Sequence, residues 1–281
     1  MPAADHAPAR GRGRALLGLL LTPVVVGVAA IALSRLHVAV EIANIVVFGG
    51  AASTVVASLA TAARSYPPPV WRLVTMAATI VALGGFAWAG VTSIGAAVVV
   101  DTLLIAGAWA MGTSIGRRIE HPGHLLPACV VVACADATSI VSQFGPTHAM
   151  AQSERALSVV AFAFPVPGTP SFAPALGVGD LVFMAIVFGA VVAHGLSILR
   201  AALLCWLGVL AAGAASALWE TVVPALVSVG AAVVLGVPEA RRLRPADRRV
   251  ATLAMAIAVA VAAAAIVSQL VRPGTDTVVD E

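Results

Sequence analysis

The feature of this sequence that most constrains its fold is a series of long apolar runs, which recurs from one end of the chain to the other. An apolar run of about 18 residues or more is long enough to cross a lipid bilayer as an α-helix. We therefore predict an all-α fold, a polytopic transmembrane helical bundle of about nine spans. The predicted spans are residues 15–34, 38–60, 70–91, 94–116, 124–142, 175–197, 199–218, 221–237 and 250–271.

Composition excludes an ordinary soluble domain. Of the 281 residues, 60% are hydrophobic and only 10% are charged, whereas soluble domains carry about 25% charged residues. The net charge of +3 comes from arginine alone, since the chain has no lysine. We interpret this arginine as a determinant of membrane topology, so that the lipid bilayer is an expected partner and nucleic acid is not.

Cysteine and histidine show no pattern typical of a metal or cofactor site. Cys129, Cys134 and Cys205 all lie inside apolar runs and form no C-x-x-C pair, so we interpret them as small membrane-buried residues. The histidines are scattered along the chain. We predict no metal and no cofactor.

The distribution of arginine predicts the orientation of the chain, because cytoplasmic connections of membrane proteins are enriched in basic residues. With the N-terminus inside, thirteen arginines fall on the cytoplasmic side and three on the other side. The thirteen are Arg10, Arg12, Arg14, Arg64, Arg72, Arg117, Arg118, Arg200, Arg241, Arg242, Arg244, Arg248 and Arg249. We predict a multi-pass protein of the plasma membrane with a cytoplasmic N-terminus and an extracytoplasmic C-terminus.

The longest connection between predicted spans is residues 143–174, which contain five prolines. Its apolar patch "ALSVVAFAF" has nine residues and is too short to cross a bilayer. A span at 156–164 would also move the arginine cluster at 241–249 to the outside. We expect this patch to lie in the membrane interface or to cover another part of the protein.

Four acidic residues lie within predicted spans: Glu41, Asp101, Asp136 and Asp180. A carboxylate at the centre of a bilayer costs about 2.5–3.5 kcal/mol even on insertion scales that give low values. Glu41 is close enough to the start of its span to reach the lipid headgroups. Asp101 is deeper, and we expect it either to pair with a polar group of a neighbouring helix or to belong to a proton path.

The positions of Asp136 and Asp180 are correlated. Asp136 lies about six residues before the end of its predicted span, and Asp180 lies about five residues after the start of the next one. Because consecutive spans are antiparallel, these two span ends are at the same membrane face. At ~1.5 Å per residue, both aspartates lie ~8–9 Å from that face. Two carboxyl groups in contact share one proton, because both cannot ionise cheaply. One can then activate water while the other polarises a carbonyl, which is general acid–base hydrolysis of a peptide bond. Two independent aspartates near helix ends are the alternative.

Three motifs resemble those of the intramembrane aspartyl proteases, presenilin and signal peptide peptidase. Asp180 stands in "LGVGDLVF", which has the Gly-x-Gly-Asp pattern of that family. Pro224, Ala225 and Leu226 form its Pro-Ala-Leu motif two spans later. The segment "ADATSIVSQFGPTHAMAQSER" is similar to the presenilin segment that begins at the first catalytic aspartate, here Asp136, and continues through Gly-Pro, here 145–146. The chain is therefore identified as resembling a bacterial or archaeal presenilin-like member, over about residues 128–235.

The resemblance implies a presenilin-like fold and an aspartic endopeptidase that cleaves within the membrane. Asp136 and Asp180 would be catalytic, and the support of the active site would come from Gly177, Val178, Gly179, Pro224, Ala225 and Leu226. The two glycines would allow a close approach of the backbone, with Pro224 to Leu226 packed beside them. Residues 1–120 would form an N-terminal half of four spans, and residues 121–281 a catalytic half. Transmembrane helices or remnant signal peptides would be the substrates, and a homo-oligomer is left open.

The sequence departs from the family pattern in three ways. Ala135 stands where a tyrosine usually precedes the first aspartate. Four spans precede the Asp136 helix where the family usually has five, and an additional span, 250–271, follows the Pro-Ala-Leu helix. By the arginine count the Asp136 helix runs from inside to outside, as in signal peptide peptidase, so we expect substrate helices with their N-terminus inside. The connection 143–174 is short for one that carries an autoproteolytic cut, and we predict a single intact chain.

Other functions remain as alternatives. A membrane transporter or channel would use Glu41, Asp101, Asp136 and Asp180 as an ion or proton path. A prepilin-type peptidase also uses an aspartate pair with Gly-x-Gly-Asp, but a lysine usually follows the aspartate, and this chain has none. A catalytically inactive scaffold is the last alternative, given Ala135. The sequence identifies neither the natural substrate nor the cleavage site.

Overall fold

The computed structural model describes residues 9–91, 93–141, 153–219 and 223–271. Each predicted span contains a helix. They are α1 (Ala9–Leu33), α2 (Val40–Ala62), α3 (Pro69–Ala89), α4 (Ile94–Gly116), α5 (Leu125–Val141), α8 (Val178–Ala193), α9 (Ile198–Trp219), α10 (Ala225–Gly236) and α11 (Arg248–Val271). Seven of them are long and apolar enough to cross a membrane, whereas α8 and α10 are shorter. The structure is thus an all-α helical membrane bundle, with seven helices of spanning length and two shorter apolar helices in the described residues.

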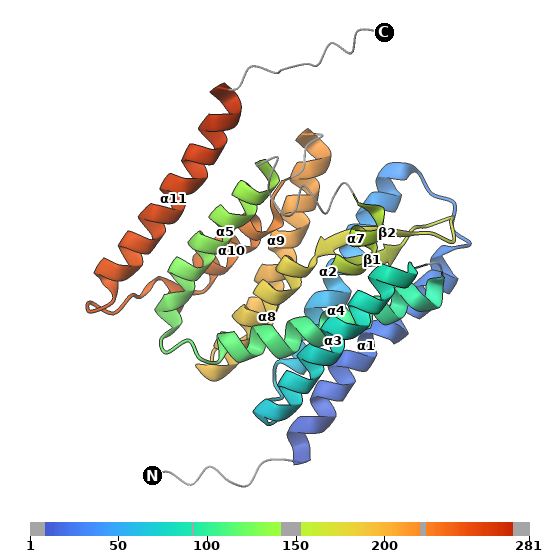
Figure 1. Cartoon of the computed structure of the whole chain (residues 1–281), viewed down its shortest axis with the longest axis horizontal. Helices are drawn as coiled ribbons and strands as arrows, with labels where there is room; N and C mark the ends of the chain where they lie inside the picture. Colours follow the sequence, from blue (N-terminus) through green and yellow to red (C-terminus); the bar gives the residue numbers. More distant parts are fainter. Residues whose placement is uncertain (1–8, 92, 142–152, 220–222, 272–281) are drawn as a thin grey trace.

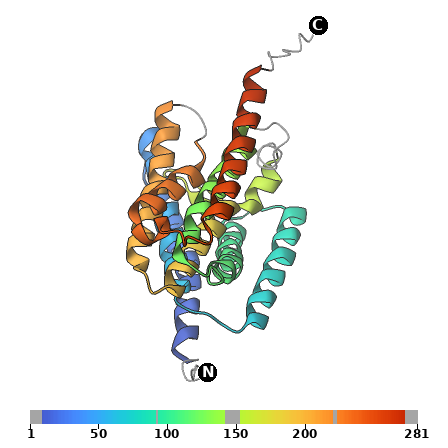
Figure 2. The same ribbon diagram turned by 90° about the vertical axis from the view of Figure 1, so that its left-hand side faces the viewer.

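The helices form an elongated bundle with α11 at one edge and α1 and α3 toward the other (Figure 1). α8 packs along α4 in the interior, α9 packs on α2 and α10, and α5 lies between α10 and α11. Figure 2 shows that α3 stands apart from most of the bundle, and its packing is on α4 and the short helix α7 (Glu154–Val160). The largest fully buried side chains include Leu59, Leu104, Leu181 and Phe188, so the core lies where α2, α4 and α8 meet.

Small residues allow α4 and α8 to approach closely. Gly112 and Gly116 of α4 face the backbone of α8, where a Cβ at Gly112 would lie 2.6 Å from the carbonyl oxygen of Val182. Gly189 of α8 faces α4 in the same way, since a Cβ added there would lie 2.9 Å from Cα of Thr113. Helices in lipid associate largely through such close contacts, because apolar side chains gain little by leaving lipid.

One segment of the all-α bundle is not helical. Strands β1 (Ala161–Pro165) and β2 (Phe172–Gly177) form an antiparallel hairpin, with an irregularity in register between Phe162 and Ala163. α7, of seven residues, precedes β1, so the apolar patch 156–164 does not span the membrane as a helix. Its aromatic residues alternate with alanine, which suits a strand with one buried face.

The hairpin also shortens the sixth predicted span. That span was expected from residue 175, but residues 172–177 pair with β1 and the helix begins at Val178. Residues 142–152 of the long connection, including the Gly-Pro at 145–146, lie outside the described residues.

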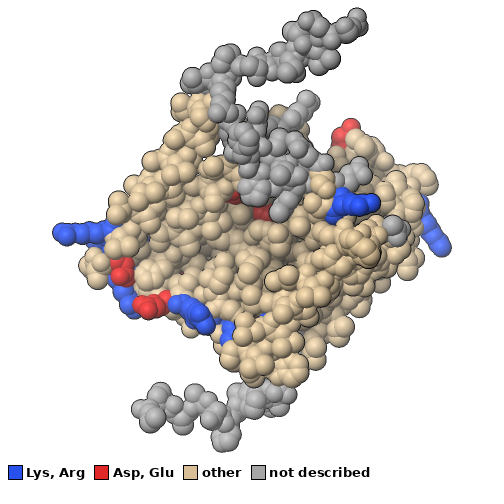
Figure 3. Space-filling view, viewed as in Figure 1, with Lys and Arg blue, Asp and Glu red and all other residues tan. Residues whose placement is uncertain are grey.

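The surface is typical of a protein in lipid. Large apolar side chains are exposed along α1, α3 and α11, for example Ile31, Val81 and Leu253. Figure 3 shows one face on which most atoms belong to uncharged residues, with arginine side chains along its lower left rim. Acidic side chains are visible near the middle of this face, beside residues that are not described.

Candidate active site

Asp180 is held at the start of α8 by the turn from strand to helix. β2 ends at Gly177, which is also the N-cap of α8, so Asp180 occupies the third helical position. Its Oδ2 accepts a hydrogen bond from the backbone N–H of Gly177 at 2.9 Å. This local bond fixes the side chain, and the positive end of the helix dipole favours an anion there.

Asp136 lies in the last turns of α5 and contacts the Pro-Ala-Leu motif. Its Oδ2 accepts a hydrogen bond from the backbone N–H of Leu226 at 3.2 Å. Leu226 is in the first turn of α10, which begins directly after Pro224. The first N–H groups of a helix have no partner within the helix, so Asp136 satisfies one of them from a neighbouring helix.

The two carboxyl groups lie in the same part of the molecule. Asp136 and Asp180 are half-buried and lie close enough to interact electrostatically. The two aspartates are thus within electrostatic range of each other, while their action as a pair stays a prediction, and α10 adds a backbone donor that spacing alone did not indicate. Each carboxyl group is anchored through one oxygen at the N-terminus of a short helix, α8 for Asp180 and α10 for Asp136.

The glycines of the Gly-x-Gly-Asp motif differ from expectation. Gly177, Val178 and Gly179 are exposed, and a Cβ added at Gly179 would meet nothing within 4 Å. A Cβ at Gly177 would make only an ordinary contact with Asp180, at 3.5 Å. The expected close approach of another backbone to these glycines is thus not made by the described residues. Among the described residues, space beside Gly179 is open.

The remaining motif residues lie at the start of α10, beside Asp136. Leu226 is buried, while Pro224 and Ala225 are half-buried. Pro224 has no N–H and leaves Leu226 as a nearby donor for Asp136. Ala135, which precedes Asp136, is exposed and offers no hydroxyl. An interaction of Asp136 with a tyrosine at that position is therefore missing from this chain.

Asp101 supports the hairpin, a role that the sequence did not reveal. It is 1% exposed in the middle of α4, and its Oδ1 accepts a hydrogen bond from the backbone N–H of Ala163 in β1 at 2.9 Å. Ala163 lies opposite Pro174, which has no N–H. The other oxygen of Asp101 has no hydrogen-bond partner among the described residues. We expected Asp101 either to pair with a polar group of a neighbouring helix or to belong to a proton path. The structure contains a polar partner, but it is the backbone of strand β1 rather than a helix.

Glu41 is exposed in the first turn of α2, as expected for an acid near a span end. It makes no ion pair within the described ranges. The four intramembrane acids are thus in three different situations: Glu41 at the surface, Asp101 beneath the hairpin, and Asp136 with Asp180.

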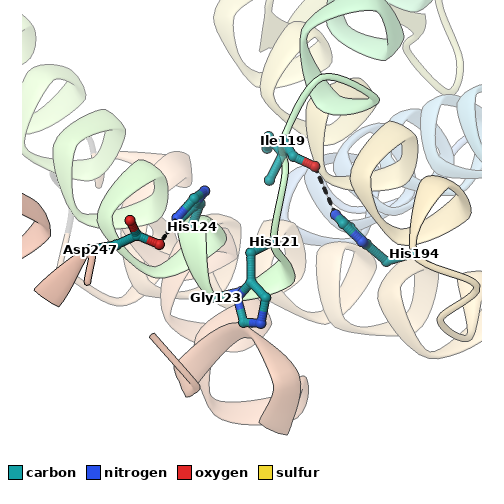
Figure 4. A network of polar contacts seen from close by, with 6 residues as sticks. All are labelled: Ile119, His121, Gly123, His124, His194 and Asp247. Carbon is teal, nitrogen blue, oxygen red and sulfur yellow. Dashed lines mark hydrogen bonds and ion pairs between the residues drawn. The ribbon is translucent and has the colours of Figure 1, made fainter. Parts of the chain in front are cut away.

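Two histidines make polar contacts at the other ends of the helices that carry the aspartates (Figure 4). His124, just before α5, donates from Nε2 to Asp247 Oδ2 at 2.9 Å. His194, just after α8, donates from Nε2 to the carbonyl of Ile119 at 2.8 Å. Within the described segments, no three His, Cys, Asp or Glu side chains are grouped as a metal site. These histidines anchor the chain between α4 and α5.

Comparison with known proteins gives no match: no family model, curated protein or solved structure is significantly similar to this chain.

Proposed function

We propose that the protein is an aspartic endopeptidase that hydrolyses peptide bonds within the membrane, with Asp136 and Asp180 as the catalytic pair. The observation that carries the proposal is the convergence of three segments far apart in sequence. Asp136 of α5 interacts with Asp180 of α8 and accepts a hydrogen bond from Leu226 of α10. Each segment belongs to one of the three motifs that resemble presenilin and signal peptide peptidase.

In the proposed reaction the pair holds one proton. The ionised aspartate takes a proton from a water molecule as that water attacks the peptide carbonyl carbon. The protonated aspartate gives its proton to the carbonyl oxygen, and the resulting diol then collapses with protonation of the amine and cleavage of the C–N bond. The anchored Oδ2 atoms orient both groups for these transfers.

The substrate must reach the pair in an extended form, because a helix shields its peptide bonds through internal hydrogen bonds. Two features support such an approach. Gly177 to Gly179 are exposed, and a Cβ at Gly179 would meet no described atom within 4 Å. β2 leads directly into the motif and is paired on one edge only, with β1, in the described sheet. A main chain that pairs with its other edge would be led to the two carboxyl groups.

The test is cleavage of a model transmembrane peptide by the purified protein in detergent. Asp136→Asn and Asp180→Asn keep the size of each side chain but remove the shared proton, and each is expected to lower the cleavage rate by a factor of about 100 or more. Glu41→Gln is the matched control, since it neutralises an exposed intramembrane acid outside the pair. Retained cleavage in either aspartate variant would contradict the assignment.

A transporter or channel is the second candidate, favoured by the interior oxygen of Asp101 that has no partner among the described residues. An acid path would make ion or proton flux in liposomes depend on Glu41, Asp101, Asp136 and Asp180 together. The protease proposal expects no such flux from the wild-type protein. It also expects that Glu41→Gln leaves cleavage unchanged.

We further propose that the protein works as one intact chain. C-terminally tagged wild-type protein should give a single immunoblot band near 28 kDa, and Asp180→Asn should give the same band. Two stable fragments in the wild type that are lost in Asp180→Asn would show that the enzyme cuts itself, contrary to this prediction.

A further inference from the structure

A second polar cluster lies away from the aspartates, around the single tyrosine of the chain. Tyr66 is in the connection between α2 and α3. The guanidinium carbon of Arg72 lies 3.9 Å from the centroid of its ring, and that of Arg117 lies 4.4 Å from it. Tyr66 thus contacts two cations at once, one from the first turn of α3 and one from the end of α4.

Protein groups satisfy only part of the hydrogen-bonding capacity of these arginines. Arg72 Nη1 donates to Ser114 Oγ at 2.7 Å, and Arg117 Nη2 donates to the carbonyl of Ala63 at 2.8 Å. Each bond uses one of the five N–H donors of a guanidinium. Arg72 is 7% exposed, and Nε of both arginines is buried with no partner among the described residues.

Among the described residues, no acidic side chain pairs with the positive charge of the cluster. The sole ion pair in the described part of the chain is His124 with Asp247. Burial lowers the pKa of the Arg117 guanidinium; Tyr66 opposes this lowering and the charge of Arg72 adds to it. The other charged side chains on the two adjoining connections are all exposed: Arg64, Arg118 and Glu120. Two like charges so close together favour an anion nearby.

The position of the cluster indicates which anions can reach it. α2 ends at Ala62, α3 begins at Pro69 and α4 ends at Gly116, so all three helices meet the cluster at one end of the bundle. The end of a membrane-spanning helix lies at the level of the lipid headgroups. Tyr66 and Trp71 are 43% and 61% exposed there, as aromatic residues at a membrane interface commonly are.

We propose that Arg72, Tyr66 and Arg117 form a binding site for a phosphate group, supplied by the headgroup of an anionic lipid. Arginine binds phosphate oxygens through paired N–H donors, and an anionic headgroup would offset the charge that protein leaves unpaired. Inorganic phosphate has the same chemistry and is the other source to be tested. The alternative is a purely structural clamp, in which Tyr66 and the two protein acceptors suffice.

The single tyrosine permits a direct test in the wild-type protein. Incorporation of 3-fluorotyrosine gives one ¹⁹F resonance from the chain, at Tyr66. The protein is placed in phosphatidylcholine nanodiscs with a rising fraction of phosphatidylglycerol, or in nanodiscs of phosphatidylcholine alone with inorganic phosphate added. A saturable shift with phosphatidylglycerol supports the lipid site. A saturable shift with inorganic phosphate supports the phosphate site with a soluble source. No saturable shift in either titration overturns the proposal.

Matched variants separate a specific site from general surface charge. Arg72→Gln is expected to weaken the phosphatidylglycerol response by about tenfold or more, the effect of losing a charge-assisted hydrogen bond. Arg118→Gln removes the same charge from an exposed position and should leave the response nearly unchanged. Equal losses in both variants would overturn the proposal. If Arg72→Gln does not fold, the titration of the wild-type protein still decides.

Discussion

The buried side chain of Asp101 is explained by its role as a hydrogen-bond acceptor rather than by its charge. One oxygen accepts the N–H of Ala163 at the irregularity of the hairpin, where the facing residue, Pro174, cannot take part in the ladder as a donor. The second oxygen has no partner in the described part of the protein. Only one acceptor atom is therefore needed at this position to hold β1.

This predicts different outcomes for two substitutions of Asp101. Asn retains an oxygen acceptor for Ala163, so Asp101→Asn should fold and cleave at close to the wild-type rate. Leu leaves that N–H unpaired, so Asp101→Leu should lose about 1–3 kcal/mol of stability and should cleave more slowly because the hairpin loosens. Thermal unfolding in detergent and peptide cleavage measure both effects. If Asn were as harmful as Leu, the charge or proton of Asp101 would be required and the transporter alternative would gain support.

Among the elements, the hairpin decides where the sixth predicted span begins. Its strand β1 is held against α2 and α4, with Phe162 and Phe164 buried. Phe164 fits against Gly50 of α2, where any Cβ would meet the aromatic ring. A Cβ added at Gly49, the residue before Gly50, would meet no described atom within 4 Å. β2, paired to β1, then carries Gly177 to the start of α8 and so sets the position of Asp180.

The two adjacent glycines give a matched pair for testing this packing. Gly50→Ala should destabilise the protein by about 1–3 kcal/mol, because the added methyl group has no room beside Phe164. It should also reduce cleavage, since β1 and β2 shift together. Gly49→Ala should leave cleavage unchanged and stabilise α2 by up to about 1 kcal/mol. Thermal unfolding and the cleavage assay compare the variants, and equal behaviour would show that Phe164 does not fix the hairpin.

For the whole molecule, the two ends of the bundle are distinct. α1 begins at one end and α11 ends at the other (Figure 1), as an odd number of crossings requires. The seven long apolar helices and the two short helices α8 and α10 would together give nine crossings. For this, β2 would have to cover the part of the membrane that α8 does not cross, and the segment before α10 would have to do the same for α10. The N-termini of α8 and α10, which hold the two aspartates by hydrogen bonds, would then lie within the thickness of the membrane rather than at its surface.

The proposed orientation is tested with reporters fused to each terminus. We expect fluorescence from a green fluorescent protein fused to the N-terminus, which requires the cytoplasm, and activity from alkaline phosphatase fused to the C-terminus, which requires export. The reason is the bias of thirteen arginines against three. Both reporters on one side of the membrane would contradict nine crossings.

The sequence alone determined the features that depend on local composition and spacing. Apolar runs predicted every long helix, because a hydrophobic segment in lipid must satisfy its backbone within itself. Counting residues along two consecutive predicted spans predicted that Asp136 and Asp180 lie near the same membrane face, and the structure places them within electrostatic range of each other. Both inferences need only the rise of a helix and the thickness of a membrane.

Tertiary structure decided what depends on contacts between distant residues. The Ala163 N–H meets Asp101 across 62 positions, Leu226 meets Asp136 across 90, and Arg117 reaches Ala63 across 54. The hairpin was missed because a short apolar patch suits either a helix or a strand until a partner strand and a small residue such as Gly50 are brought beside it. Backbone donors and acceptors carry no sequence signal of their own, so only the packing of the bundle determines which side chain each one meets.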